Sequence, residues 1–307
     1  MSVSSLFKGF SAQVGQLPEL LVVMTCRLSL LTIFCLLLWV GCKDKPNPEP
    51  VRCAVVSVTD QLDAGGRLTD QMLRSFTYTA GQLTQLAERN TDRQLALTVE
   101  YSTNGQLLRA STGRFALSFD YTPGQTLPSR ATSIQGGNPL AVYDLAYSAN
   151  NKLARVFENR QVLASNSLVR SREYLFTYDD NGNLLTEKLK STLNDRTTVE
   201  QETDFTYGTG MGPMANFAQP VLLTVAALSQ YVETMPAQFW QQRILKEYKT
   251  YNARNGVRST VRETATFTPS LDGDNRLVGQ EQNTVSTTGS GQTFTRRNKL
   301  TFAYGCQ

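Results

Sequence analysis

The sequence predicts an all-β protein, an antiparallel meander of about a dozen strands that curls into a barrel or an open half-barrel. The first observation behind this prediction is a recurring motif: an apolar residue, any residue, a tyrosine, a turn with glycine or asparagine, and a leucine. The second is the alternation of apolar and polar residues between motifs, as in residues 95–99, which is typical of a sheet with one face in water. The third is the absence of helical periodicity between most motifs, which favours antiparallel over parallel pairing.

The motif predicts one β-hairpin per repeat. Its clearest copy runs from Phe176 through Tyr178 and Gly182 to Leu184. A two-residue spacing places the apolar residue and the tyrosine on one face of a strand, and glycine supplies the positive φ of the turn. Successive tyrosines from Tyr78 to Tyr207 are 20 to 31 residues apart, so the repeat varies in length. The copies begin at Phe76, Val99, Phe119, Leu145, Phe176, Phe205, Phe267 and Phe302.

One segment departs from the repeat. Residues 215–245 carry apolar side chains at steps of three and four, which predicts one or two short helices broken near Pro236. These helices either cap or plug the open sheet or offer an apolar patch to a partner or a bilayer. We favour the cap, because a curled sheet with an open end needs its apolar interior covered. This insertion is also the segment in which we most expect function.

The first part of the chain predicts a secretory signal. Residues 24–41 begin with Met24, carry Arg27, and continue with an apolar run over residues 28–40. That run is shorter than the roughly 20 apolar residues that span a bilayer. We expect Met24 to be the true start and residues 1–23 an upstream over-extension; the alternative is that they lengthen the basic region of the signal.

The end of this signal carries a lipid-attachment motif. Trp39-Val40-Gly41-Cys42 resembles the signal end of bacterial lipoproteins, with tryptophan where leucine is usual. The resemblance implies cleavage before Cys42 and a diacylglyceryl thioether on its sulfur, and Lys43 resembles the residue that directs sorting to the outer membrane. The alternatives are an ordinary cleaved signal with an unrelated cysteine, or an uncleaved anchor. Residues 42–52 would form a proline-spaced tether between the lipid and a single β domain at 53–307.

The five cysteines fall into three groups. Cys26 and Cys35 leave with the signal, Cys42 carries the lipid, and Cys53 and Cys306 remain at the two ends of the β domain. In an oxidising compartment such a pair predicts a disulfide that joins the first strand to the last. Two separate free thiols are the alternative.

The repeat also carries a family resemblance. Residues 178–184 resemble the YD repeat of Rhs-type proteins, and the array over about 53–307 resembles Bacteroidota lipoproteins described as YD-repeat or porin-like domains of unknown function. The resemblance implies a long antiparallel sheet that curls into a barrel or half-barrel. It brings no catalytic residues with it.

Composition excludes several chemistries. The chain has no histidine, which rules out Ser-His-Asp triads, Cys-His dyads and His-ligated metal sites. The Asp-rich segments at 179–183 and 272–275 resemble calcium loops, but they lack the glutamate of an EF-hand and fit hairpin turns. We therefore assign no catalytic residue, metal or cofactor, and the scattered positive charges argue against nucleic acid. Five glutamates are expected on the solvated face of the sheet: Glu173, Glu187, Glu202, Glu247 and Glu263.

These observations favour a lipid-anchored outer-membrane protein, on the periplasmic face or the cell surface, that acts as a binding or scaffold module. Its partner would be a hydrophobic ligand, a glycan or a protein. The tyrosine series is either a ligand-stacking stripe or, as we expect, part of the sheet's own core. One alternative is a histidine-independent hydrolase with two carboxylates in a cleft; another is a fragment of a Rhs-like shell. An apolar cavity under the insertion would favour a ligand carrier, whereas a filled one would favour a structural role.

Overall fold

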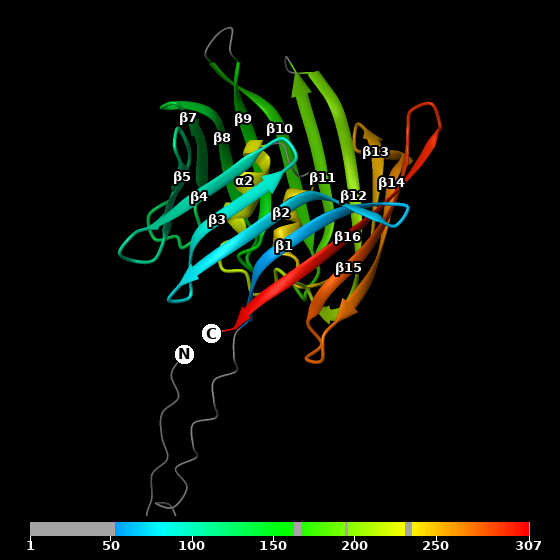
Figure 1. Cartoon of the computed structure of the whole chain (residues 1–307). Coiled ribbons are helices and arrows are strands. Elements are labelled where there is room, and N and C mark those ends of the chain that lie inside the picture. Colours follow the sequence, from blue (N-terminus) through cyan, green and yellow to red (C-terminus); the bar gives the residue numbers. More distant parts are fainter. Residues whose placement is uncertain (1–52, 163–166, 194–195, 231–234, 307) are drawn as a thin grey trace, which may run out of the picture. The chain divides into compact units, whose positions relative to one another are not determined.

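The computed structural model describes residues 53–162, 167–193, 196–230 and 235–306. The signal, the lipid-attachment motif and the tether predicted for residues 1–52 lie outside the described residues. The described residues form sixteen strands, one α-helix and one 3₁₀ helix, with each strand antiparallel to the next and the last paired with the first (Figure 1). The all-β meander is therefore confirmed, as a closed barrel with more strands than the predicted dozen.

The strands are β1 (Cys53–Ala64), β2 (Arg67–Thr79), β3 (Gln82–Asn90), β4 (Gln94–Tyr101), β5 (Leu107–Thr112), β6 (Phe115–Asp120), β7 (Arg130–Gln135), β8 (Asn138–Tyr147), β9 (Leu153–Val162), β10 (Ser167–Tyr178), β11 (Leu184–Leu193), β12 (Arg196–Met211), β13 (Arg243–Arg254), β14 (Val257–Leu271), β15 (Leu277–Thr287) and β16 (Thr293–Cys306). The insertion between β12 and β13 carries α2 (Pro220–Gln230) and η1 (Pro236–Trp240). A Rhs-like shell would need a spiral sheet, whereas the strands here follow one another around a single ring.

The barrel closes where β1 meets β16. Cys53 and Cys306 lie opposite each other in this ladder, and a disulfide joins them. We call this the terminal end of the barrel and the opposite end the far end. Because the strands alternate in direction, the motif turns and the insertion between β12 and β13 all emerge at the terminal end.

The repeated tyrosines hold adjacent strands together at the terminal end. Seven of them donate a hydroxyl hydrogen bond to a backbone carbonyl near the start of the preceding strand, as Tyr178 does to Leu153 at 2.8 Å. The seven acceptors are Val55, Leu83, Leu107, Pro128, Leu153, Leu184 and Leu277. On β14 proline replaces the tyrosine, and the Leu245 carbonyl instead accepts from the side-chain amide of Gln280. The rings pack on the core, so the tyrosine series is part of the core.

Removing one of these hydroxyls should cost little but measurable stability. We expect Tyr178→Phe to lower the free energy of unfolding by about 1 kcal/mol, because the Leu153 carbonyl loses its side-chain donor. Tyr251→Phe is the matched control, since Tyr251 points to the outer face, where the Arg258 guanidinium covers its ring. Urea denaturation of both variants measures the difference. Equal stability of the two variants would show that the tyrosine hydroxyls contribute nothing.

The motif turns contain the Asp-rich segments. The Asp179 carboxylate accepts hydrogen bonds from the backbone N–H groups of Asn181 and Asn183, and Gly182 has a φ of 76°. Asp272 accepts in the same way from Asp274 and Arg276. Both segments are therefore hairpin turns that use their own carboxylates.

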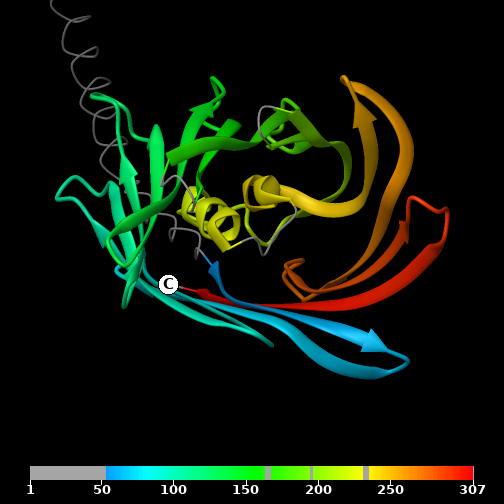
Figure 2. The same ribbon diagram turned by 90° about the horizontal axis from the view of Figure 1, so that it is seen from above.

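The predicted helical insertion fills one side of the lumen. Nine of the eleven residues of α2 are buried, and Figure 2 shows the helix inside the ring of strands. The predicted break at Pro236 is where η1 begins, whereas Ile244 and Leu245, which were expected in the helical segment, belong to β13. Trp240 donates to the Thr224 hydroxyl, which donates in turn to the Pro236 carbonyl and so ties η1 to α2.

Arginines of the barrel wall hold the carboxyl end of α2. Arg160 and Arg172 both donate to the Leu228 carbonyl, and Arg93 donates to the carbonyl of Gln230. Cations are favourable at this end of a helix, where the carbonyls are unpaired. Glu158, which is fully buried, accepts from both Arg160 and Arg172 and offsets one of their two positive charges. The plug predicted from the sequence is therefore fixed against β9 and β10.

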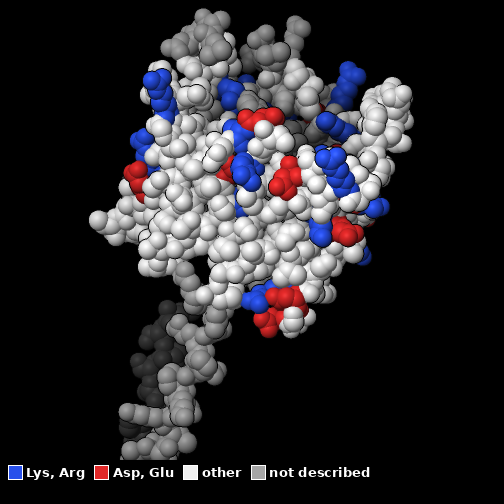
Figure 3. All heavy atoms as spheres, viewed as in Figure 1, with Lys and Arg blue, Asp and Glu red and all other residues white. Residues whose placement is uncertain are grey.

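The outer face of the barrel is mostly polar, with single apolar side chains such as Leu108, Leu175 and Leu185 exposed among the polar ones. In β4, Gln94, Ala96, Thr98 and Glu100 are exposed, while the alternate residues are buried. Figure 3 shows charged side chains scattered over the wall, and ion pairs such as Arg155–Glu173 join neighbouring strands there. A membrane-spanning barrel needs the opposite pattern, an apolar band on the outside and a polar lumen. The wall therefore has the composition of a surface in water.

No helix among the described residues has the length and apolar character needed to cross a bilayer.

Candidate ligand-binding cavity

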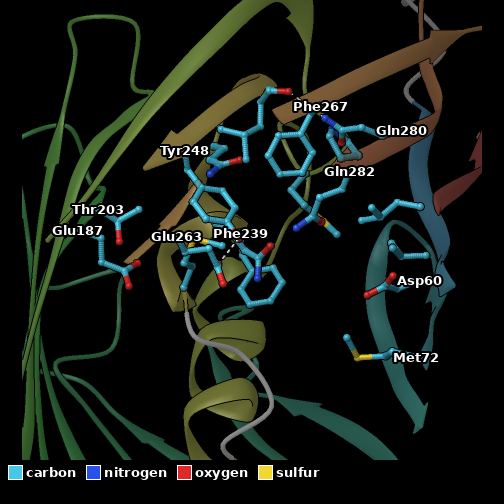
Figure 4. Close-up of a pocket in the computed structure, with 18 of the residues that line it drawn as sticks. Asp60, Met72, Glu187, Thr203, Phe239, Tyr248, Glu263, Phe267, Gln280 and Gln282 are labelled. Carbon is cyan, nitrogen blue, oxygen red and sulfur yellow. Dashed lines mark hydrogen bonds between the residues drawn. The ribbon is translucent and has the colours of Figure 1, made fainter. Parts of the chain in front are cut away.

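The insertion leaves a cavity of about 500 Å³ on the other side of the lumen. Its walls come from β1, β2 and β11 to β16, and its inner side from the insertion. Figure 4 shows Glu187 and Thr203 on one side and Asp60 and Met72 on the other, with Phe239, Tyr248 and Phe267 between them. The volume falls within the range of roughly 300–1,000 Å³ typical of small-molecule sites.

The lining of the cavity reaches toward both ends of the barrel. Arg262 and Arg296 lie near the far-end turns and are exposed, while Pro213 and Met214 lie where the insertion begins, at the terminal end, and are partly exposed. The leucines that follow the motif turns are at most 1% exposed and pack in the core: Leu83, Leu107, Leu153, Leu184 and Leu277.

A bulge beside most copies of the motif decides which residues face this lumen, although β6 and β7 pair without one. The register of β10 and β11 shifts between Thr177 and Tyr178, so that Leu185 is an extra residue. The side chain three positions after the motif leucine therefore points inward, where strict alternation would point it outward. Corresponding shifts occur next to Tyr78, Tyr101, Tyr147, Tyr207 and Leu271.

The type of side chain at this position, three residues after the motif leucine, differs between the two sides of the barrel. On the side that the insertion fills, it holds small or aliphatic residues: Leu86, Ala110 and Val156. On the open side it holds Glu187, Tyr248 and Gln280, all of which line the cavity. Equivalent backbone positions thus carry apolar side chains against the plug and hydrogen-bonding side chains against the cavity. A fold that needed only a core would have no reason for this change.

Glu187 is the most unusual of these residues. It is 3% exposed, accepts a hydrogen bond from the backbone N–H of Ala237, and its Oε2 atom has no partner among the described residues. Burial raises the pKa of Glu187 to about 8, because the ionised form loses its hydration. The side chain is therefore mostly a neutral carboxylic acid at pH 7. A perturbed acid in a cavity is a typical feature of a functional site.

Gln241 supplies a second unpaired atom. It follows η1, is 9% exposed and lines the cavity, and its Nε2 atom has no partner among the described residues. Buried polar atoms in folded proteins are nearly always paired with protein, water or ligand. The lining therefore includes two residues, one on β11 and one on the insertion, each with a buried polar atom that has no partner among the described residues.

The other carboxylates of the cavity are already paired. Glu263 accepts hydrogen bonds from the Tyr248 hydroxyl at 2.6 Å and the Ser286 hydroxyl at 2.7 Å, one at each oxygen. Asp60 accepts from the side-chain amide of Asn298 at 2.7 Å. These two side chains shape the wall, and the unsatisfied hydrogen-bonding capacity lies with Glu187 and Gln241.

The prediction of five solvated glutamates is wrong for two of them. Glu173, Glu202 and Glu247 pair with cations on the outer face, where Glu202 is only 7% exposed. Glu187 points into the lumen because a bulge reverses the alternation on β11, whereas Glu263 points inward by regular alternation with Ala265 and Phe267 on β14. An alignment of the repeats on their leucines would have revealed Glu187 at a position that is otherwise apolar.

Comparisons with known proteins bear on the fold. No family model matches the chain, and no curated protein matches it. Among solved structures, a porin-like protein from Bacteroides uniformis is 15% identical, with a TM-score of 0.50, 81% of this chain covered and 96% of that one. The fold resembles that porin-like protein. A porin-like protein from Bacteroides vulgatus has 12% identity, a TM-score of 0.46 and coverage of 83% and 99%; a protein of unknown function from Bacteroides fragilis has 11%, 0.32, 52% and 91%.

The raised pKa of Glu187 predicts a pH-dependent stability. The unfolded chain loses this proton near pH 4.5 and the folded chain near pH 8, so the free energy of unfolding should fall as pH rises between these values. The slope is about 1.4 kcal/mol per pH unit for one proton. The neighbouring Tyr178 and Tyr207 have pKa values raised well above this window and do not contribute.

Urea denaturation of wild type and Glu187→Gln at several pH values measures this effect. Glutamine cannot ionise, so the variant should lose the slope and gain stability relative to wild type as pH rises toward 8. Parallel profiles for the two proteins would show that Glu187 ionises normally in the fold.

Proposed function

We propose that this protein is a lipid-anchored, extracytoplasmic binding module that holds a small ligand inside its barrel. The single observation that carries the proposal is the half-filled lumen: a cavity of about 500 Å³ beside a fixed plug, with two buried polar atoms that lack partners. A barrel that served only as a scaffold would gain stability by filling this space with side chains.

Two features argue against a pore despite the likeness to a porin-like protein. The insertion fills one side of the lumen with the buried residues of α2, and the outer wall carries charges where lipid would require apolar residues. A barrel that binds a ligand needs neither a membrane-spanning wall nor a passage from one end to the other.

The anchor would come from Cys42, through the tether over residues 42–52. Because β1 begins at the terminal end, this tether would attach at that end, and the exposed Arg262 and Arg296 of the cavity lining would lie toward the opposite end. A ligand that enters past these two arginines would come from the side away from the attachment point. The outer membrane is the compartment that the lipoprotein resemblance implies.

Metabolic labelling with an alkyne analogue of palmitate tests the anchor. Cells that express the full-length chain should yield a labelled protein, and Cys42→Ser should remove the label completely. Cys306→Ser is the control that keeps the motif, and it should retain the label. A Cys42→Ser protein that still labels would disprove lipidation at this residue.

Native mass spectrometry of the protein purified from its own cells tests the container. We expect an adduct of small-molecule mass that is lost on denaturation and absent from Thr203→Trp, because the indole would fill the cavity that Thr203 lines. An adduct that survives in Thr203→Trp would place the ligand elsewhere.

Hydrolysis is the second candidate, and one observation favours it. Glu187 is a neutral acid and Glu263 a second carboxylate in the same cavity, the pair of groups that a glycosidase needs. Both oxygens of Glu263 are engaged by Tyr248 and Ser286, which fits a wall residue better than a nucleophile. Incubation with p-nitrophenyl glycosides distinguishes the two: binding alone leaves them intact, whereas release of nitrophenol that Glu187→Gln abolishes would favour the hydrolase.

A further inference from the structure

We propose that the ligand of this cavity is an uncharged, hydroxyl-rich molecule with the chemistry of a small oligosaccharide, held between Glu187, Gln241 and the aromatic wall. The inference rests on the proposed function, since it names the chemical class of the ligand that the container would hold. It follows from three features of the lining.

The first feature is the pair of unpaired polar atoms. Gln241 presents an N–H donor, and Glu187 presents a carboxyl oxygen that is mostly neutral at pH 7. A hydroxyl group both accepts and donates, so the same ligand group type satisfies either atom. Glu187 and Gln241 supply neither the ionised partner that a fixed cation would need nor the buried positive charge that a fixed anion would need. Of the arginines in the lining, Arg74 is paired with Glu88, and Arg262 and Arg296 are exposed.

The second feature is the density of amides and hydroxyls next to these atoms. Gln201, Gln282, Thr203 and Thr250 line the cavity from β12, β13 and β15. The amide of Gln282 uses one N–H for the Thr284 hydroxyl at 2.9 Å and retains its carbonyl and its second N–H. Neutral groups that both donate and accept match a ligand with several hydroxyls better than a lipid chain.

The third feature is the aromatic wall. Phe239, Tyr248 and Phe267 line the cavity together, and the Tyr248 and Phe267 rings are 5.9 Å apart with an angle of 48° between their planes. Flat nucleobases stack on ring faces. Phe239 and Tyr248 are only 2% and 3% exposed, so the half-buried Phe267 offers most of the accessible ring surface. We expect a puckered ring, whose C–H faces are apolar and whose edges carry hydroxyls, to pack one face there.

A binding experiment tests the ligand class. Saturation-transfer NMR and calorimetry on the purified mature chain would measure binding of a panel of neutral di- and trisaccharides. The panel covers the gluco, manno and galacto configurations. The comparison probes are a uronic-acid disaccharide, adenosine and oleate. We expect a neutral saccharide to bind more tightly than the three comparison probes.

Variants then locate the site. Glu187→Leu and Gln241→Leu should each weaken saccharide binding about tenfold, the effect of one lost hydrogen bond in a buried site. Glu187→Gln should stay within about threefold of wild type, because it keeps a neutral hydrogen-bonding group. Glu281→Gln, on the outer face of the same strand as Gln282, is the control and should leave binding unchanged. Circular dichroism checks that each variant is folded, and Gln282→Leu provides a further cavity variant if Glu187→Leu is not.

The outcomes separate this inference from the proposed function. Binding of oleate, adenosine or the uronic acid in preference to every neutral saccharide, with loss in Thr203→Trp, would overturn the ligand class and leave the container intact. Saccharide binding that survives in both leucine variants would overturn the assigned site. Binding of no probe by folded wild type would overturn both.

Discussion

Replacement of Glu158 by alanine should lower the free energy of unfolding by about 3–5 kcal/mol, the effect of removing one partner from a buried ion cluster. Glu158 is fully buried and accepts hydrogen bonds from Arg160 at 2.9 Å, from Arg172 at 3.0 Å and from Ser171 at 2.7 Å. Without it, two guanidinium groups lose the buried carboxylate to which both donate, while their hydrogen bonds to the Leu228 carbonyl of α2 remain. The loss should therefore appear both as global instability and as a loosened plug.

Glu173→Ala is the matched control for this prediction. Glu173 lies on β10 next to Arg172 but on the outer face, where it pairs with the half-exposed Arg155. Exposed ion pairs contribute about 0–1 kcal/mol, so this variant should change little. Urea denaturation and the fluorescence of Trp240, which packs in the plug, measure both effects. Similar losses for the two variants would show that the cluster does not hold α2.

Opening the disulfide should have the other large effect. Cys53 and Cys306 are 253 positions apart, and a cross-link over so long a loop stabilises by roughly 5 kcal/mol in the chain-entropy model. The double variant Cys53→Ser, Cys306→Ser should therefore unfold at markedly lower urea concentration than oxidised wild type. It should match reduced wild type and be insensitive to reductant.

Mass spectrometry without reduction provides the control for this prediction. Alkylation of the unfolded, unreduced chain should leave Cys53 and Cys306 unmodified. Alkylation of both residues would show that the thiols are free, and the stability difference would then need another cause.

The sequence predicts the architecture well because the repeat couples local and global structure. Within nine residues, the motif shows three things about the fold. Phe176 marks the inward face of a strand, the Tyr178 hydroxyl joins that strand to the preceding one, and Leu184 begins the next strand. The insertion can also be predicted from the sequence. Its apolar residues recur every three to four positions, which indicates a helix, and Pro236 marks where the helical segment breaks. Short strands such as β5, β6 and β7, with six residues each, carry too little pattern to be counted, which explains the predicted dozen.

The cavity residues are harder to predict from the sequence, because a bulge determines whether Glu187 faces the lumen. Strict alternation from Leu184 places Glu187 outside, and only the extra residue at Leu185 turns it inward. Ala237 on η1, which donates a hydrogen bond to Glu187, and Gln241, which lines the same cavity, reach these positions only when the insertion folds into the lumen. Hydrogen bonds between segments some 50 residues apart leave no local signal in a single sequence.

We propose that a barrel with its wall in water is held at the membrane by lipid alone, and Triton X-114 phase separation tests this most directly. The reference is the full-length protein, which we expect in the detergent phase, and the test protein is residues 43–307, which lacks both the apolar signal and Cys42. We expect it to enter the aqueous phase as a folded monodisperse barrel, because its outer face is mostly polar. A folded 43–307 barrel that enters the detergent phase would show that the wall itself contacts lipid and would contradict this proposal.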